Sequence, residues 1–411
     1  MSVTTVPERR TAAVVRTHMR RVRVAQIVTK FSAGAGGVTL FGALALDPDR
    51  YSTTVFTADG GSCLDRAQAA ELPVVVIPHL AGGRGIYPSV DVQAFRELRA
   101  ELARGRFDLV HTNSAKAGAI GRLAARSLGV QAVVHTFHGF PFHAFQSRPV
   151  RLGLEAIERR LARITDYFLA AGTVTAADAI RLDIAPPERI RPIAPPIDVA
   201  VPPASAAARR DARRSLGIPA DAQVIGTTAR LDGQKAPLDM VTAFAALGRR
   251  DVHMLWIGDG NLRRKTERLI QRKGIGDRFH LLGNRADVSI LLPALDVFAL
   301  SSLYEGLPCA LAEAMCFGIP VVATAVNSVP EIVMAGTTGL LARPGDPASL
   351  TRALAYMLDH PTEAARMATA ARAHIGDRFR PDVYGRALTD AYELALRFGS
   401  HRARRNGSQP R

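Results

Sequence analysis

The sequence predicts an α/β protein with two Rossmann-like domains. Its 411 residues are enough for two cores of ordinary size. Short β-branched runs alternate with amphipathic, helix-length segments in both halves, a pattern typical of parallel sheets with crossover helices. A stretch rich in Pro and Ala, from Pro186 to about Arg214, separates the two series and is typical of a linker.

Each series contains several runs that we expect to form strands. In the first half they are 22–28, 52–56, 74–77, 109–111, 133–136 and 167–170. In the second half they are 224–228, 254–257, 279–281, 297–300 and 320–323, and after about Asp359 the pattern is helical. The predicted organisation is a disordered basic tail at 1–21, a domain at 22–195, a linker at 196–220, a second domain at 221–372, helices at 373–400 and a disordered tail at 401–411.

The composition predicts a folded, strongly basic protein. Hydrophobic residues make up 47% of the chain and charged residues 22%, and the formal net charge is +16. Only five of the 53 basic residues are lysines, so arginine dominates the surface charge. Such a surface attracts nucleic acid, anionic lipid headgroups or phosphorylated small molecules, or is simply solvated, and the charge alone does not choose among these. We expect no nucleic acid partner.

The three cysteines, Cys63, Cys309 and Cys316, have neither an even count nor metal-ligand spacing, which favours a reducing compartment. No apolar run is long enough to span a bilayer, and the basic N-terminus lacks the apolar stretch of a signal peptide. We therefore expect a cytoplasmic protein.

Glycines come after the first predicted strand, at Gly34, Gly36 and Gly37. Glycines there let backbone N–H groups approach a phosphate, and the start of the next helix adds its dipole. A dinucleotide fingerprint would need a third glycine where Thr39 stands, although Asp59 after the second strand leaves NAD binding open. A plain tight turn is the other interpretation.

Charged side chains come after two predicted strands of the second half. Arg230 and Lys235 lie beyond the strand at 224–228, where two cations can neutralise a diphosphate without a metal. Glu305 precedes a predicted helix at 309–317, and Glu313 lies on the side of that helix opposite its apolar stripe. In open α/β sheets ligands bind at the carboxyl ends of strands, so these side chains could border one cleft.

Taken in order, these motifs resemble the retaining GT-B glycosyltransferases of family 4. The resemblance covers roughly 22–359, and its most specific part is the pair Glu305-x7-Glu313. It rests on Arg230 with Lys235, Gly258-Asp259-Gly260, the run from Gly283 to Val288, Glu305 with Glu313, and in the first half the runs from Thr112 to Gly118 and from Thr136 to Phe140.

The resemblance implies a GT-B fold, in which two Rossmann-like domains face each other across a cleft and a C-terminal helix, here 381–398, crosses back to the first domain. The N-terminal domain would bind the acceptor and the C-terminal domain a nucleotide-sugar, with UDP suggested by family frequency. The transfer of a hexose-type sugar would retain the anomeric configuration.

The resemblance also implies roles for single residues. Arg230 and Lys235 would hold the donor pyrophosphate and assist its departure, and Glu305 would touch the sugar. His138 would lie near the sugar across the cleft, and Glu313 would bind the ribose. The remaining donor-binding candidates are Gly36 and Gly37, which would close over the pyrophosphate, Arg285, and the backbone near Gly306, Leu307 and Pro308.

This chain departs from the family pattern at two places. Pro195 and Pro196 stand where the family often has Asn-Gly, which bears on the hinge, and Ala236 replaces a frequent glycine after the lysine. The sequence Asp47-Pro48-Asp49 matches the Asp-x-Asp metal-binding motif, but the proline predicts a turn. We expect no metal and no other cofactor.

The acceptor side is suggested by the aromatic segment 140–145 and the helix at 148–164. Val150, Leu154, Ile157, Leu161 and Ile164 share one face of that helix and several arginines the other. A basic face beside exposed aromatics suits a reversible contact with an anionic membrane surface. This suggests a polyprenyl-diphosphate-linked sugar as acceptor, in polysaccharide synthesis at the inner face of the cell membrane. The alternative is a packed helix whose solvated face carries Glu155 and Glu158.

Three other functions remain open at this point. A nucleotide-sugar epimerase on the same fold would convert the donor without an acceptor. An NAD-dependent oxidoreductase would bind NAD and not UDP. A non-catalytic protein would bind the nucleotide without turnover.

Overall fold

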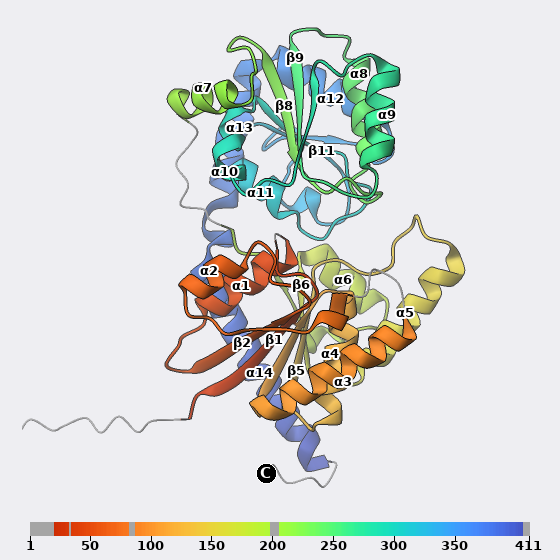
Figure 1. The fold of residues 1–411 in the computed structure, drawn as a ribbon, viewed down its shortest axis with the longest axis vertical. Coiled ribbons are helices and arrows are strands. Elements are labelled where there is room, and N and C mark those ends of the chain that lie inside the picture. The colour runs from red at the N-terminus through yellow and green to blue at the C-terminus, as the bar shows by residue number, and fades with distance from the viewer. Residues whose placement is uncertain (1–19, 33, 82–86, 198–204, 406–411) are drawn as a thin grey trace, which may run out of the picture.

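A computed structural model describes residues 20–32, 34–81, 87–197 and 205–405 of the chain. These residues form two α/β domains, one above the other in Figure 1. Each domain is built on one parallel sheet with helices packed against it. The two predicted Rossmann-like domains are therefore confirmed.

The N-terminal sheet has the strand order β3-β2-β1-β4-β5-β6-β7. Its strands are β1 Val22–Val28, β2 Tyr51–Thr57, β3 Val74–Val76, β4 Leu109–Asn113, β5 Ala132–Phe137, β6 Tyr167–Ala171 and β7 Ile190–Ile193. Its helices are α1 Ala35–Ala45, α2 Leu64–Ala69, α3 Pro88–Gly105, α4 Ala115–Ser127, α5 Arg148–Ala162 and α6 Thr173–Arg181. Strands β4, β5 and β6 are buried along their whole length, as expected for a sheet covered on both faces.

The C-terminal sheet has the order β10-β9-β8-β11-β12-β13. Its strands are β8 Gln223–Thr228, β9 Val252–Ile257, β10 Phe279–Gly283, β11 Val297–Leu300, β12 Val321–Thr324 and β13 Leu340–Ala342. Its helices are α7 Ala206–Ser215, α8 Pro237–Ala246, α9 Arg263–Lys273, α10 Val288–Leu291, α11 Cys309–Cys316, α12 Pro347–Asp359 and α13 Pro361–Ile375.

The strand order of each sheet reverses once, between β1 and β4 and between β8 and β11. In open α/β sheets such a switch point leaves a crevice outside the carboxyl ends of the two strands. Loops after β5 and β11 line one common cavity, so the carboxyl ends of the two sheets face each other. This arrangement places the candidate site between the domains.

Two strands were not predicted, and both lie at a sheet edge. Strand β7 contains Pro192 and falls inside the Pro-rich stretch that we interpreted as a linker; an edge strand tolerates a proline because one side needs no ladder hydrogen bonds. Strand β13 has three residues, too few for a period-2 pattern to stand out.

The expected linker at 196–220 differs from the structure. Helix α7 occupies most of its described part, and the Ser205 side chain caps that helix by accepting a hydrogen bond from the Ala208 N–H (3.1 Å). Ala212 is buried in the C-terminal core, and Arg213 donates to Asp296 (2.7 Å). Residues 205–220 therefore belong to the C-terminal domain; residues 198–204 lie outside the described part of the chain.

Helix α14, Pro381–Arg405, crosses back to the N-terminal domain, as predicted. Its apolar side chains are buried in one cluster with residues of β1, β4, β5 and β6; the helix contributes Tyr384, Leu388, Ala391, Tyr392 and Ala395. The Tyr392 hydroxyl lies 2.8 Å from His111 Nδ1 on β4. The end of the chain is thus part of the first domain's core.

The predicted tails at 1–21 and 401–411 lie mostly outside the described residues. At the boundaries the structure shows Arg20 bonded to Asp108 (2.8 Å) and helix α14 continuing to Arg405. Among the described helices, none has the length and apolar character needed to cross a membrane.

The contact between α14 and β4 gives a stability prediction. His111 is buried, with Nε2 2.7 Å from Thr136 Oγ1, so Tyr392→Phe leaves Nδ1 without a partner. We expect the free energy of unfolding to fall by about 1–3 kcal/mol. Urea unfolding measures this loss, with Tyr356→Phe, at an exposed tyrosine, as the matched control. A loss no larger than that of the control would contradict the prediction.

Candidate functional site

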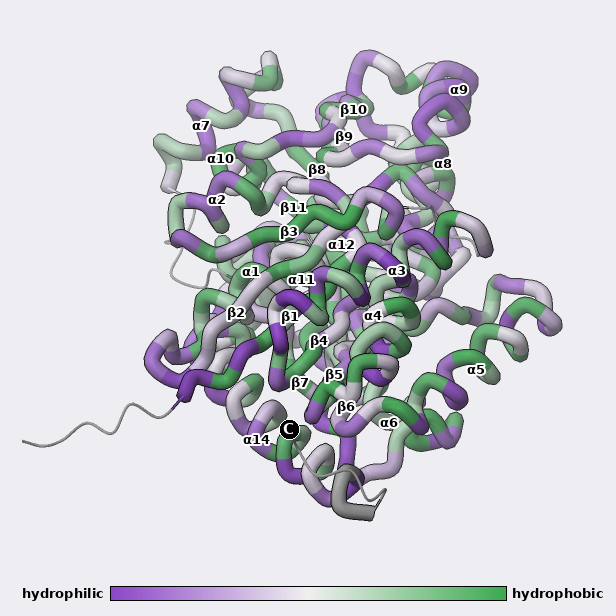
Figure 2. The backbone as a smooth tube through the Cα atoms, turned by 60° about the horizontal axis from the view of Figure 1, so that its bottom comes forward, coloured by the Kyte–Doolittle hydropathy of each residue, from purple (hydrophilic) through white to green (hydrophobic). Residues whose placement is uncertain are grey.

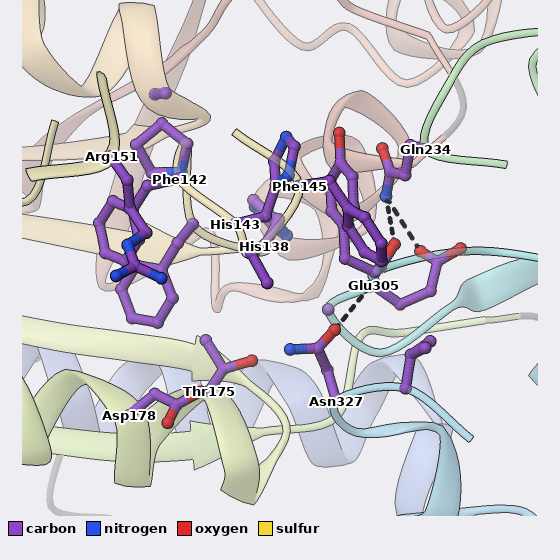
Figure 3. Close-up of a pocket in the computed structure, with 18 of the residues that line it drawn as sticks. His138, Phe142, His143, Phe145, Arg151, Thr175, Asp178, Gln234, Glu305 and Asn327 are labelled. Carbon is purple, nitrogen blue, oxygen red and sulfur yellow. Dashed lines mark hydrogen bonds between the residues drawn. The ribbon is translucent and has the colours of Figure 1, made fainter. Parts of the chain in front are cut away.

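A cavity of about 770 Å³ lies between the two domains. The N-terminal domain lines it with Ser114, His138, the segment 139–145 and side chains of α5 and α6. The C-terminal domain lines it with Gln234, the segment 303–306, Val326 and Asn327. Figure 3 shows His138 and His143 on one side of this space and Gln234, Glu305 and Asn327 on the other.

The two walls touch at a pair of glycines. A Cβ atom added to Gly306 would lie 2.0 Å from the carbonyl oxygen of His138, so no other residue fits there without moving the domains apart. On the facing side, Gly139 has a φ of +142°, a backbone conformation that disfavours side chains. Glycine at 306 therefore permits the closest approach of the two loops.

A hydrogen-bonded network joins the predicted cations to Glu305. The Lys235 ammonium donates to Glu305 Oε1, which also accepts from Ser302 Oγ (2.5 Å). Gln234 Nε2 donates to Glu305 Oε2 (3.3 Å) and to the Tyr304 carbonyl (3.0 Å), as the dashed lines in Figure 3 indicate. Gln234 Oε1 in turn accepts from Arg230 Nη2 (3.0 Å).

Backbone contacts hold these side chains at adjacent strand ends. The loop after β8 carries Lys235. The backbone carbonyl of Lys235 accepts a hydrogen bond from Ser301 Oγ (2.7 Å) in the loop after β11. The Leu303 N–H donates to the Gln234 carbonyl (2.8 Å). The switch point between β8 and β11 therefore brings the two predicted motifs together.

The ion pair between Lys235 and Glu305 is largely shielded from water. The two side chains are 13% and 6% exposed, whereas that of Arg230 is 54% exposed and pairs with Asp232 (2.8 Å). Removing one partner of a buried pair leaves an uncompensated charge, so the pair depends on both members.

Glu313 lies on α11 with its carboxylate unpaired. No hydrogen bond or ion pair within the described residues reaches this carboxylate, and burial raises its pKa. It does not line the cavity. An unpaired, partly buried carboxylate is suited to accept hydrogen bonds from vicinal hydroxyl groups.

His138 lines the cavity opposite Glu305. Its Nε2 lies 2.9 Å from Asn113 Oδ1, and burial lowers its pKa to about 4, so the imidazole is neutral at physiological pH. Nearby, His143 stacks on Tyr304 of the other domain, with ring centroids 3.9 Å apart. Two imidazoles of the N-terminal wall therefore lie beside the segment that carries Glu305.

The other predicted donor-binding residues do not line this cavity. Gly36 and Gly37 lie in the first turn of α1, where a Cβ on Gly36 would lie 2.5 Å from the Lys30 carbonyl oxygen. Arg285 is exposed and donates to Asp287 (2.8 Å). Leu307 and Pro308 are buried just before α11.

Three smaller points of the sequence can be compared with the structure. Asp287 stands at the N-cap of α10, where its side chain makes no capping hydrogen bond and instead accepts from Arg285. Asp47 Oδ1 accepts from the Asp49 N–H (2.9 Å), which confirms the turn there. Thr39 is buried and donates to the Ala35 carbonyl (2.8 Å), so a packed side chain fills the third position of the dinucleotide fingerprint.

Within the described residues, no cluster of His, Cys, Asp or Glu side chains could hold a metal ion.

The acceptor-side helix is oriented differently from either sequence interpretation. Glu155 and Glu158 were expected on a solvated face of a packed helix, but they are only 7% and 2% exposed. Of the five apolar side chains assigned to one face, Leu161 is buried, whereas Val150 and Ile157 are exposed. The helix is rotated by the ion pair between Glu158 and Arg122 of α4 (2.8 Å), whose two side chains are both buried.

Sequence reasoning missed Gln234, Asn327 and Glu331. Asn327 Oδ1 accepts from the Glu305 N–H (2.9 Å), and Asn327 has a φ of +41°. Gln234 adjoins Lys235, and Asn327 comes shortly after β12, so their positions beyond strand ends were the signal that could have found both.

Glu331 joins the domains at a second place. Its carboxylate accepts from the Thr173 and Val174 N–H groups (both 2.9 Å) in the first turn of α6. Although burial raises the pKa of Glu331, the hydrogen bonds from these backbone N–H groups help to hold it below its ordinary value. The neighbouring Gly172 has no side chain to cap the helix, and a Cβ there would lie 2.2 Å from Ser328 Oγ.

This contact predicts an interdomain contribution to stability. Glu331→Ala leaves two N–H groups of α6 without their acceptor, which we expect to cost about 0.5–2 kcal/mol, the range for losing a helix cap. Glu331→Gln should restore part of the loss because an amide oxygen still accepts one bond. Urea unfolding tests this against Glu363→Ala, at an exposed glutamate paired with Arg366. Equal stability of both alanine variants would rule the cap out.

Three buried histidines predict acid sensitivity. Burial, the largest cause, lowers the pKa of His111 to about 3 and of His138 to about 4, and that of His135 well below the ordinary 6.5. The unfolded chain therefore binds more protons below about pH 6.5, and stability falls as the pH falls, by about 1.4 kcal/mol per pH unit for each histidine.

Denaturant titrations between about pH 6.5 and 5 measure this slope. His111→Gln should make the slope shallower by about 1.4 kcal/mol per pH unit. His360→Gln, at an exposed histidine, is the control. An unchanged slope in the His111 variant would contradict the prediction.

Comparison with known proteins identifies the family. A family model described as Glycosyl transferases group 1 matches residues 208–374, and one described as Glycosyltransferase Family 4 matches residues 34–201. The chain is 31% identical to the UDP-Gal:alpha-D-GlcNAc-diphosphoundecaprenol alpha-1,3-galactosyltransferase of Escherichia coli, over 66% of this chain and 71% of that protein. It is 30% identical to a D-inositol 3-phosphate glycosyltransferase of Saccharomonospora viridis, over 88% of this chain and 90% of the relative.

Solved structures share the fold. Anabaena HepE in complex with UDP and glucose superposes with a TM-score of 0.77 at 21% identity, covering 91% of this chain and all of that one. WaaG, a glycosyltransferase involved in lipopolysaccharide biosynthesis, gives a TM-score of 0.71 at 18% identity, covering 90% and 99%. These likenesses confirm the predicted GT-B fold.

Proposed function

The chain belongs to the group 1 glycosyltransferases, and we propose that it transfers a hexose from a UDP-sugar to a lipid-linked acceptor with retention of configuration. The observation that carries this proposal is the network of Arg230, Gln234, Lys235 and Glu305, of which Gln234 and Glu305 line the interdomain cavity together with His138. Cations and a carboxylate meet where a diphosphate-sugar would have to lie.

The positively charged side chains indicate where the donor would bind. Arg230 and Lys235 would bind the pyrophosphate and stabilise the charge that develops as it leaves, so that no metal is needed. Glu305 would accept hydrogen bonds from the sugar, and Glu313 from the ribose. The loop of Gly36 and Gly37 would reach the donor only after a movement of the N-terminal domain, whereas Arg285 would bind it from the C-terminal domain.

Retention is proposed from the family, and the way Glu305 is held bears on the route. Both of its carboxylate oxygens accept hydrogen bonds from the C-terminal domain, which makes Glu305 a poor nucleophile. His138 is uncharged, because burial lowers its pKa to about 4. We therefore favour departure of the leaving group and then attack of the acceptor hydroxyl from the same face.

The nature of the substrates is supported by the relatives. The Escherichia coli relative is named for UDP-galactose and a diphosphoundecaprenol-linked acceptor, and HepE was solved with UDP-glucose. A lipid-linked acceptor would place this enzyme in cell-surface polysaccharide synthesis, peripherally at the inner face of the membrane.

A panel of nucleotide sugars tests the proposal directly. Purified protein is incubated with each donor, and slow donor hydrolysis and thermal stabilisation are scored. We expect one UDP-sugar to stabilise the protein and to be hydrolysed in the presence of EDTA, releasing a sugar whose first-formed anomer matches the donor. Conversion of the donor to its epimer, or stabilisation by NAD alone, would overturn it.

Two variants test how the network acts. Arg230→Ala, at a half-exposed side chain, should lower kcat/KM for the donor by about a hundredfold, as expected for loss of one group that stabilises the leaving charge. Glu305→Gln should lower turnover while UDP still stabilises the fold. Arg264→Ala, at an exposed arginine of α9, is the control in steady-state assays. Full turnover in both variants would show that neither side chain acts in the transfer.

A further inference from the structure

Asn113 is the last residue of β4, and its side chain contacts His138 without lining the cavity itself. The amide oxygen of Asn113 lies 2.9 Å from His138 Nε2. Asn113 is only 1% exposed, whereas His138 lines the cavity. The amide therefore acts on the cavity through the imidazole.

The backbone fixes the position of Asn113. Strands β4 and β5 lie side by side in the N-terminal sheet (Figure 2), with Asn113 opposite Thr136. The next residue, Ser114, has a φ of +68°, a conformation that is unfavourable for residues other than glycine. Ser114 Oγ lies 2.8 Å from Thr29 Oγ1 in the loop after β1. The turn at the end of β4 is thus held by a neighbouring strand end, and the amide of Asn113 is fixed with it.

The contact defines which nitrogen of His138 carries a proton. Burial lowers the pKa of His138 to about 4, so the ring carries a single N–H near neutral pH. The amide oxygen of Asn113 can only accept a hydrogen bond, so this proton is on Nε2. His138 Nδ1 is then left with a lone pair.

This lone pair is accessible from the cavity. His138 Nδ1 makes no hydrogen bond to any described residue. Unlike His143 Nδ1 and Asn113 Nδ2, however, it is not buried without a partner, and the ring lines the cavity. His138 therefore presents a hydrogen-bond acceptor to whatever occupies this space.

Asn113 also carries a cost that a purely structural side chain would avoid. Its Nδ2 is buried with no partner among the described residues. A buried donor without an acceptor destabilises a fold, and an apolar side chain at the same place would not have this defect. The hydrogen bond to His138 is what the amide supplies in return.

The titratable groups around His138 are compatible with a neutral ring. On the neighbouring strands His111 and His135 are buried, and burial lowers the pKa of both. On the facing loop the charge of Glu305 is balanced by Lys235. The bond to the amide therefore remains the contact that sets the tautomer of His138.

We propose that Asn113 is a positioning residue that keeps His138 as the Nε2–H tautomer, so that Nδ1 accepts a hydrogen bond from a substrate hydroxyl. The inference rests on the proposed function, because a nucleotide-sugar or its acceptor supplies that hydroxyl. A sugar hydroxyl both donates and accepts, and a ring nitrogen that only accepts selects one orientation of it. Asn113 itself touches no substrate.

Nitrogen-15 NMR of histidine-labelled protein tests the tautomer without any assay of activity. The signals of His138 are assigned by their loss in His138→Ala. In the wild type near neutral pH we expect a protonated Nε2 and an unprotonated Nδ1, and in Asn113→Ala a mixture of both tautomers. A protonated Nδ1 in the wild type would overturn the proposal.

Donor hydrolysis tests whether Asn113 acts through His138. Asn113→Ala should lower kcat about tenfold or more, as loss of the partner that orients a metal-binding histidine does. The double variant Asn113→Ala with His138→Ala should be no slower than His138→Ala alone, because the amide then has nothing to position. Losses that multiply in the double variant would refute this role. Gln271→Glu, at an exposed amide of α9, is the control and should keep the wild-type rate.

Asn113→Asp separates positioning from packing. A carboxylate still accepts from Nε2, so kcat should approach the wild-type value at high pH. The carboxylate also raises the pKa of His138, so kcat should fall as the pH drops through the raised value and Nδ1 gains a proton. The wild type, with a His138 pKa of about 4, should show no such fall near neutral pH. Identical pH profiles of both proteins would contradict the proposal.

The positioning role and the proposed function can fail separately. The expected tautomer, without hydrolysis of any nucleotide sugar, would refute the proposed function and support the role of Asn113. Hydrolysis by a protein whose His138 carries its proton on Nδ1 would refute the role of Asn113 alone.

Discussion

The contact on which the site depends is the shielded ion pair between Lys235 and Glu305. It joins the loop after β8 to the loop after β11, the two strands at which the C-terminal sheet reverses its order. The switch point alone would leave an open crevice; the ion pair, with Gln234 and Ser302, holds both loops at its rim. Gly306 then lets the other domain approach this rim closely, so that His138 faces a prearranged carboxylate.

The two domains are joined by the chain and also by contacts far from it. Helix α14 leaves the C-terminal domain and becomes part of the N-terminal core, and Glu331 caps α6 from across the cleft. Helix α6 carries Thr175 and Asp178, which line the cavity. The hydrogen bonds from Glu331 therefore link the relative position of the two domains to the position of α6, which lines the N-terminal side of the cavity.

Local pattern predicted most of the fold and the chemistry of one wall. Buried parallel strands such as β6 and β11 are continuous apolar runs, and Arg230, Lys235 and Glu305 stand just beyond the carboxyl ends of strands, where ligands bind. Edge strands β7 and β13 carry weaker patterns, and the cap by Glu331 joins residues about 160 positions apart, which no local pattern reports. The orientation of α5 was missed for the same reason, because it depends on Arg122 in another helix.

The residues that line the cavity suggest how donor and acceptor divide it. Lys235 and Glu313 do not line the open space, whereas Phe142, Arg151 and Thr175 do, so most of the space in this conformation lies on the N-terminal side, where we propose that the acceptor binds. The Lys235 ammonium is meanwhile neutralised by Glu305. In the proposed function, an entering pyrophosphate would share this ammonium and thereby loosen its hold on Glu305, which would free carboxylate lone pairs for the sugar hydroxyls. Binding of the leaving group and release of the carboxylate would then be one electrostatic event at a single ion pair.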